Sequence, residues 1–229
     1  NHVGELALEY DANKVLLVTD QGIRSAGHVD KIVASLEKAK LFVIVYDQAK
    51  ENPTTECVAE CVALAQAEQI DFIIGLGGGS SMDTAKGCNF LLTNGGEMKD
   101  YWGIGKASKP MLPLIAIPTT AGTGSECQSF ALISDAATHA KMACGDPKAM
   151  AKVAILDSEL TLSQPQRVTA CTGIDAVAHA VESAVTRKRN ETSQQYSRVA
   201  FSLLSKSLPI VLKDSTNLEA RGRMLLGAA

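Results

Sequence analysis

Three short apolar runs alternate with helix-like segments near the start of the chain, and this alternation constrains the fold more than any other feature. The runs cover residues 13–19, 41–46 and 72–76. Continuous apolar runs of this length are typical of parallel strands that are buried on both faces. The residues between them have the apolar spacing of helices. The pattern therefore predicts an α/β fold with a parallel, Rossmann-like sheet that carries helices on both faces.

The second part of the chain has a different pattern. Further strands are predicted over residues 113–117, 131–134 and 153–156. From residue 160 onward the spacing is helical, with almost no β-branched alternation. We therefore expect a dinucleotide-binding α/β domain over residues 1–158 and the start of an all-helical domain over residues 159–229. Residues 220–229 have helical spacing without a stop signal after them, so we expect a fragment with a truncated helical domain.

Composition excludes several classes of protein. With 229 residues, of which 46% are hydrophobic, the chain can bury a normal core. A formal net charge of −3 and the absence of like-charge runs argue against a nucleic-acid partner. Neither a membrane span nor a signal peptide is recognisable. The six cysteines are scattered without a C-x-x-C motif, which favours a reducing compartment. We expect a cytoplasmic protein that binds neither nucleic acid nor a membrane.

Two glycine-rich loops follow predicted strands and could bind a phosphate-bearing cofactor. Residues 77–80, Gly-Gly-Gly-Ser, lie between a strand and a helix, where backbone N–H groups and the helix dipole favour an anion. The sequence departs from G-x-G-x-x-G, and a tight turn that needs glycine is the alternative. Residues 119–125 form a second loop after the next strand. Because parallel strands end at one edge of a sheet, the two loops together favour a cofactor crevice.

Three further residues are candidates for chemistry or binding. Asp175 and His179 are four residues apart, so a helix places both on one face, where a carboxylate and an imidazole can hold a divalent metal. An ordinary surface pair on a solvated helix is the alternative. Asp20 follows the first strand, where a carboxylate could accept hydrogen bonds from a ribose and repel a 2′-phosphate. A helix cap is the alternative for Asp20.

These motifs, in this order, resemble those of the iron-containing alcohol dehydrogenase family, the metal-dependent group III enzymes. The resemblance covers nearly the whole chain and rests on V-T-D (ending at Asp20), N-P-T (52–54), G-G-G-S-S-M-D-T-A-K (77–86), P-T-T-A-G-T-G-S-E (118–126), K-M (141–142) and G-I-D-A-V-A-H-A-V-E (173–182). It implies an N-terminal dinucleotide-binding domain, an all-helical C-terminal domain, and NAD(P) and a metal bound between them.

The resemblance also implies roles for individual residues. Asp175 and His179 become metal ligands at the catalytic centre, and Asp20 favours NAD over NADP. The other implied cofactor contacts are Asn52, Gly78, Gly79, Ser80, Thr119, Thr120 and Lys141. Asp83 is a motif residue with two open roles, stabilising the helix and its loop or reaching the nicotinamide. Two further histidine ligands of the family's metal would follow residue 229, so we expect this chain alone to bind metal poorly and to be inactive.

The implied reaction is the reversible oxidation of a primary alcohol to an aldehyde. The metal, Fe²⁺ or alternatively Zn²⁺, would act as a Lewis acid on the substrate oxygen, and the nicotinamide would take the hydride. No side chain is an evident general base. A zinc-dependent polyol enzyme similar to glycerol dehydrogenase, or the related dehydroquinate synthase, is one alternative, and a nucleotide-binding fragment is another. A homo-oligomer is expected, whereas the sequence does not indicate which alcohol is used.

Overall fold

The computed structural model describes residues 2–229, and the chain forms two compact units. The first, here called the α/β unit, runs up to Ile117 and continues over Ser125–Ile155. The second, here called the helical unit, comprises Pro118–Gly124 and Leu156–Ala229. Because the loop at 118–124 belongs to the helical unit, the chain passes between the units more than once. The single boundary at residue 158 therefore stays a prediction.

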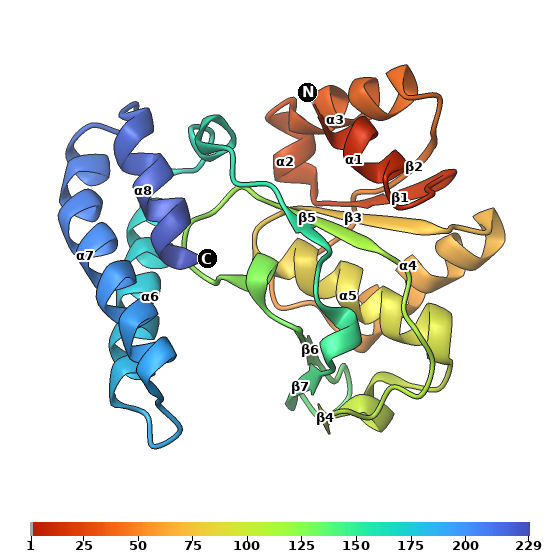
Figure 1. Ribbon diagram of the computed structural model, residues 1–229. Helices are drawn as coiled ribbons and strands as arrows, with labels where there is room; N and C mark the ends of the chain where they lie inside the picture. The colour runs from red at the N-terminus through yellow and green to blue at the C-terminus, as the bar shows by residue number, and fades with distance from the viewer. Residues whose placement is uncertain (1) are drawn as a thin grey trace. The chain divides into compact units, whose positions relative to one another are not determined.

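A five-stranded sheet forms the centre of the α/β unit (Figure 1). Its strand order is β2-β1-β3-β5-β8. The strands are β1 (Lys14–Val18), β2 (Phe42–Tyr46), β3 (Phe72–Gly77), β5 (Leu114–Pro118) and β8 (Val153–Ala154). β1 pairs in parallel with both β2 and β3, and β5 pairs in parallel with β8. All of β3 is buried, which is why its sequence is a continuous apolar run.

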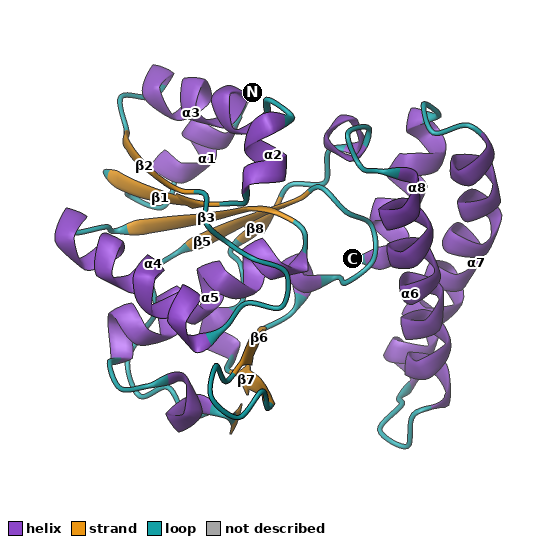
Figure 2. Cartoon of the chain, turned by 180° about the vertical axis from the view of Figure 1, so that it is seen from behind, coloured by secondary structure: helices purple, strands orange, loops and turns teal. Residues whose placement is uncertain are grey.

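Helices cover both faces of this sheet (Figure 2). One face carries α1 (Val3–Leu8), α2 (Gln21–Ser25) and α3 (His28–Lys38), and the other carries α4 (Thr55–Glu68) and α5 (Gly79–Asn94). α4 begins at the predicted N-P-T turn, where Thr54 Oγ1 accepts a hydrogen bond from the Cys57 N–H. The predicted α/β class with a parallel sheet is confirmed.

A second, smaller sheet packs on the far side of α5. Its strand order is β4-β7-β6, and β6 pairs with β7 in antiparallel register. The strands are β4 (Gly103–Ile104), β6 (Phe130–Ser134) and β7 (Lys141–Gly145). α5 contacts both β3 and β6, so it lies between the two sheets, and Ser81–Phe90 are all buried. The strand predicted at 131–134 therefore exists, but it belongs to this sheet and not to the parallel one.

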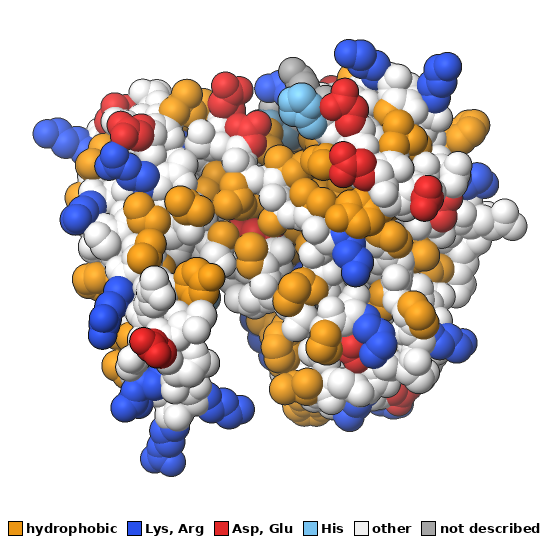
Figure 3. All heavy atoms as spheres, in the orientation of Figure 1, with side chains coloured by type: hydrophobic (Ala, Val, Ile, Leu, Met, Phe, Trp, Pro, Cys, Tyr) orange, Lys and Arg blue, Asp and Glu red, His pale blue; other side chains and the backbone are white. Residues whose placement is uncertain are grey.

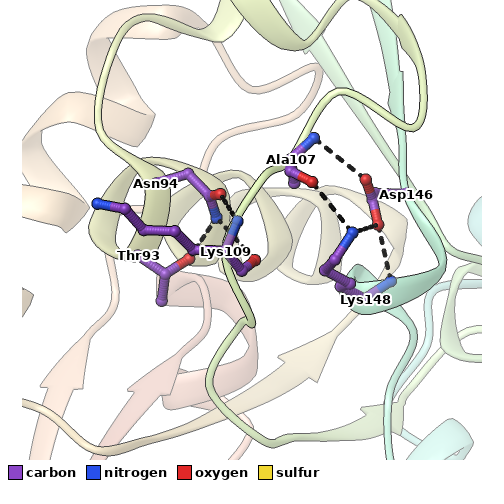
Figure 4. A network of polar contacts seen from close by, with 6 residues as sticks. All are labelled: Thr93, Asn94, Ala107, Lys109, Asp146 and Lys148. Carbon is purple, nitrogen blue, oxygen red and sulfur yellow. Dashed lines mark hydrogen bonds and ion pairs between the residues drawn. The ribbon is translucent and has the colours of Figure 1, made fainter.

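Short 3-10 helices occur in the connections, and a polar network holds the segment between β4 and β5. The 3-10 helices are η1 (Met98–Tyr101), η2 (Ser125–Cys127), η3 (Pro147–Ala149) and, in the helical unit, η4 (Ser158–Thr161). Figure 4 shows Asp146 and Lys148 holding Ala107: Asp146 Oδ2 accepts from the Ala107 N–H at 3.1 Å, and Lys148 Nζ donates to the Ala107 carbonyl at 3.0 Å. Asn94, at the end of α5, accepts from the Lys109 N–H at 2.7 Å.

The helical unit packs α6 (Gln166–Val185), α7 (Glu191–Lys213) and α8 (Leu218–Ala228) around its own apolar cluster. Gly173 allows α6 to approach α7 closely, because a Cβ there would lie 2.4 Å from Leu208 Cδ1. Figure 3 shows Lys and Arg side chains gathered where α6 is joined to α7, around residues 187–189, Arg-Lys-Arg. Within residues 2–229, no helix combines the length and the apolar character that a membrane span requires.

Candidate functional site

Asp20 links the carboxyl ends of two neighbouring strands, β1 and β3. It is the N-cap of α2, and its Oδ1 accepts a hydrogen bond from the Ile23 N–H at 3.0 Å. Its Oδ2 accepts a hydrogen bond from Ser81 Oγ, in the first turns of α5, at 3.2 Å. The helix cap considered from the sequence is therefore present. A carboxylate has about four acceptor positions, so the cap and a contact with a ribose hydroxyl are compatible.

The turn from β3 into α5 has the composition of an anion site. Gly77 has a φ of 143°, and a Cβ there would lie 2.5 Å from Ser81 Oγ, so only glycine fits. Gly78 is the N-cap of the 16-residue helix α5, and no side chain caps this end. Gly78, Gly79 and Ser80 are only partly buried. The uncapped N–H groups and the helix dipole therefore fit the pyrophosphate of a dinucleotide.

Asn52 and Lys141 are distant in sequence but in direct contact. Lys141 Nζ, at the start of β7, donates a hydrogen bond of 3.2 Å to Asn52 Oδ1. A parallel bridge between Thr54 and Ser134 brings the turn before α4 beside β6. Asn52 has a φ of 52°, a left-handed conformation that Asn tolerates better than most residues. Both side chains are exposed and could reach a ligand together.

Thr119 and Thr120 belong to the helical unit. Thr119 is 2% exposed, and its Oγ1 has no hydrogen-bond partner within residues 2–229. A buried hydroxyl without a partner is costly, so this oxygen fits a site that a polar ligand group completes. Ala121 is buried in the same apolar cluster as Ala176 and Ala180 of α6, which fixes the loop on the helical unit.

Asp175 and His179 face each other across one turn of α6. His179 Nε2 lies 3.6 Å from Asp175 Oδ1, and the two side chains are 46% and 49% exposed. This distance is too long for a hydrogen bond. It is close to the roughly 3.4 Å between two ligands that share one tetrahedral ion at about 2.1 Å. The separation is therefore compatible with a shared divalent metal and also with the ordinary surface pair.

The described part of the chain provides only a partial ligand set. Across residues 2–229 there is no group of three or more His, Cys, Asp or Glu side chains that could hold a metal. Glu182 is exposed and lies about one helical turn beyond His179. A metal at Asp175 and His179 would need further ligands from water, from substrate or from residues other than these.

A buried polar cluster on α5, formed by Asp83, Lys86 and Ser125, was not predicted as a unit. Lys86 is 0% exposed. Its ammonium donates to Ser125 Oγ at 3.0 Å and to the carbonyls of Ser125, Gln128 and Phe130 at 2.5, 2.8 and 3.1 Å. Ser125 Oγ in turn donates to Asp83 Oδ1 at 3.1 Å. The cluster therefore holds the segment that immediately follows the 118–124 loop.

Burial dominates the titration of this cluster. It raises the pKa of Asp83 to about 6, although the Lys86 charge, the Ser125 hydroxyl and the Leu132 N–H oppose the rise. It lowers the pKa of Lys86 to about 8, against the opposite influence of the Asp83 and Glu126 carboxylates. Of the two roles left open for Asp83, these contacts support stabilisation of the helix and its loop. No local signal marks Lys86, because the periodicity of α5 does not reveal that both of its sides are covered.

Comparisons with known proteins identify the family of the chain. Residues 1–158 match the family model described as iron-containing alcohol dehydrogenase, and residues 169–229 match the model of the C-terminal domain of that family. The NAD-dependent methanol dehydrogenase of Bacillus methanolicus is 36% identical over 97% of the chain and 58% of its own length. Alcohol dehydrogenase 4 of Schizosaccharomyces pombe is 41% identical over 91% of the chain and 50% of its own length.

A solved structure gives the same result at the level of the fold. The crystal structure of a 1,3-propanediol oxidoreductase superposes with a TM-score of 0.96 at 33% identity. The superposition covers 99% of this chain and 59% of that one. The chain thus spans only about half to three-fifths of the length of the relatives that it matches.

Proposed function

The chain belongs to the iron-containing alcohol dehydrogenase family, and from this premise we propose that the protein interconverts a primary alcohol and an aldehyde with NAD and a divalent metal. Fe²⁺ is the proposed metal, with Zn²⁺ as the alternative. When bound, the metal would supply Lewis acidity at the substrate oxygen, and the nicotinamide would accept or return the hydride. The substrate is a small alcohol or aldehyde whose identity the chain leaves open.

The proposed roles follow from the contacts of each residue. Asp175 would hold the metal and reduce its positive charge, while His179 would fix the ligand geometry. Gly78, Gly79 and Ser80 would bind the pyrophosphate at the α5 N-terminus. The remaining proposed cofactor contacts are Asp20, Asn52, Thr119, Thr120 and Lys141. The observation that carries the proposal is the 3.6 Å separation of Asp175 Oδ1 and His179 Nε2 on a half-exposed face of α6.

The decisive experiment removes one proposed metal ligand. In the complete enzyme, Asp175→Ala should abolish metal-dependent alcohol oxidation, because the metal would lose a ligand and the negative charge that reduces its own. NADH binding, measured by fluorescence titration, should remain close to that of the wild type, since the proposed cofactor contacts are unchanged. Glu68→Ala, which removes an exposed carboxylate at the end of α4, is the control and should keep full activity. Retained metal-dependent turnover in Asp175→Ala would refute the proposal.

The same assay separates the alternatives. A panel of primary alcohols and polyols is tested with added Fe²⁺ or Zn²⁺. Preference for polyols with Zn²⁺ would favour an enzyme similar to glycerol dehydrogenase. NADH binding without turnover of any alcohol would indicate a nucleotide-binding module.

Cofactor preference provides a second test, at Asp20. We expect Asp20→Asn to strengthen NADPH binding relative to NADH, because the carboxylate that would repel a 2′-phosphate becomes neutral. Asn caps a helix about as well as Asp, so α2 should be preserved in this variant. Asp20→Ala removes the cap as well, at a cost of about 1 kcal/mol. An unchanged ratio of NADPH to NADH dissociation constants in Asp20→Asn would exclude this role.

The cellular setting is also part of the proposal. All six cysteines are free thiols, which supports a reducing compartment such as the cytoplasm. We place no nucleic acid or membrane among the partners, and we propose a homo-oligomer. Size-exclusion chromatography with light scattering on the complete enzyme tests the oligomeric state.

A further inference from the structure

The loop at residues 118–124 lies directly against α6, and Gly122 makes the closest approach. A Cβ at Gly122 would lie 2.5 Å from Thr172 Cβ and 2.7 Å from the Thr172 carbonyl oxygen. Real Cβ atoms do not tolerate such distances, so any other residue would push the loop away from the helix. Gly122 is not among the glycines with positive φ. Its requirement for glycine is therefore steric and not conformational.

The surface that Gly122 meets is held in place by hydrogen bonds. Gln164 Nε2 donates to Thr172 Oγ1 at 2.9 Å, and Thr172 Oγ1 donates to the Val168 carbonyl at 2.9 Å. The Thr172 side chain is thus fixed in one rotamer. Together with the burial of Ala121 in the apolar cluster of the helical unit, this fixes two consecutive loop residues on α6.

The contact between Gly122 and Thr172 lies, along the chain, close both to residues proposed to bind the cofactor and to residues proposed to bind the metal. Along the loop, Thr119 and Thr120 come three and two residues before Gly122. Along α6, Thr172 comes three residues before Asp175 and seven before His179, which is about one and two helical turns. A shift of the loop on the helix would therefore move the proposed cofactor contacts relative to the proposed metal ligands.

We propose that the contact between Gly122 and Thr172 couples cofactor binding at the 118–124 loop to metal binding on α6, so that each ligand strengthens the binding of the other. This inference rests on the proposed function, because it needs both ligands. Coupling between two sites is reciprocal, and it commonly changes affinity by a factor of about 5–150. Gly122 and Thr172 act here as positioning residues.

The test measures NADH affinity in the complete enzyme with and without metal. The dissociation constant of NADH is determined by fluorescence titration, first with chelator and then with saturating Fe²⁺ under anaerobic conditions. We expect Fe²⁺ to lower this constant at least about fivefold in the wild type. In Gly122→Ala the ratio should fall towards one. The control is Gly222→Ala in α8, where the nearest atom to the new Cβ is 3.8 Å away, and it should keep the wild-type ratio.

A second variant keeps the test valid where Gly122→Ala does not fold. Thr172→Val has nearly the same shape but loses the hydroxyl that bonds Gln164, so the ratio should fall to an intermediate value. Thermal unfolding and direct titration with Fe²⁺ verify that each variant is folded and still binds the metal. A wild-type ratio of one, or an unchanged ratio in the folded variants, overturns the inference. Failure of the proposed function is a separate result, namely metal-dependent turnover that survives in Asp175→Ala.

Discussion

The buried polar cluster on α5 and the Asp175–His179 pair on α6 each combine a carboxylate with a basic side chain, but they depend on solvent in opposite ways. Lys86 is 0% exposed and makes four hydrogen bonds within the chain. His179 and Asp175 are about half exposed, and their closest atoms are 3.6 Å apart. The hydrogen bonds of the Lys86 ammonium are made within the chain, whereas the carboxylate and imidazole of the Asp175–His179 pair still have lone pairs that could bind a metal.

The difference in solvent exposure predicts that the buried polar cluster stabilises the fold and that the exposed pair serves ligand binding. A buried charge must be paired and hydrogen-bonded, because an unpaired one costs several kcal/mol. Removing a member of the buried polar cluster should therefore destabilise the fold. An exposed pair is solvated in any case and contributes little to stability. Removing a member of that pair should affect ligand binding and leave the fold intact.

The largest loss of unfolding free energy is expected from Lys86→Met. The methionine fills the volume of the lysine stem, but the Asp83 carboxylate loses its nearest cation and the carbonyls at 125–130 lose their donor. Breaking a buried pair in this way costs about 3–5 kcal/mol of unfolding free energy. Urea denaturation of the protein measures the loss. Lys99→Met, at an exposed ion pair with Glu97, is the matched control and should leave the midpoint almost unchanged.

If Lys86→Met lowers the free energy of unfolding by less than about 1 kcal/mol, the buried polar cluster behaves like a surface pair. The contrast between the cluster and the Asp175–His179 pair is then wrong.

The next effect is a pH dependence that Asp83 contributes. Burial raises the pKa of Asp83 from 3.8 to about 6, so between these values the folded state binds more protons than the unfolded state. Stability should therefore fall as pH rises from about 4 to 6, by at most about 3 kcal/mol. Asp83→Asn imitates the protonated form and removes this fall. Urea denaturation from pH 4 to 7 should show the variant gaining stability relative to the wild type as pH rises.

Asp146 supplies the control for this prediction. Burial alone would raise the pKa of Asp146, but hydrogen bonds from Lys148 and the Ala107 N–H hold the pKa below its usual value. Its contribution to stability is therefore present above the unfolded pKa and is lost only at more acidic pH. The difference between Asp146→Asn and the wild type should stay constant from pH 5 to 7. A constant difference for Asp83→Asn as well would contradict the assignment of a raised pKa.

The parallel sheet was predictable because β1 and β3 are buried on both faces and therefore have continuous apolar sequences. The helices α3, α4 and α5 were predictable from spacing and from turn signals such as the N-P-T before α4. The second sheet was not, because β4 has only two residues and the apolar run in β6 carries no information about its pairing partner. Local patterns report burial, whereas pairing depends on contacts between distant residues.

The candidate site shows the same division. The i, i+4 spacing places Asp175 and His179 together because one helix carries both. The contact between Lys141 and Asn52 joins residues 89 positions apart, and no periodicity relates them. A lysine on a helix is usually solvated, and Lys86 is buried only because α5 lies between two sheets.

The smallest change in unfolding free energy is expected at the exposed Asp175–His179 pair. His179→Ala and Asp175→Ala should each change the free energy of unfolding of the metal-free protein by no more than about 0.5 kcal/mol, as for other exposed i, i+4 pairs. A double-mutant cycle with both substitutions, measured by urea denaturation in the presence of chelator, isolates the interaction between the two side chains. With metal added to the complete enzyme, the wild type should gain stability through ligand binding, whereas neither single variant should. A coupling above about 1 kcal/mol without metal would mean that the pair stabilises α6 directly and is as structural as the buried polar cluster.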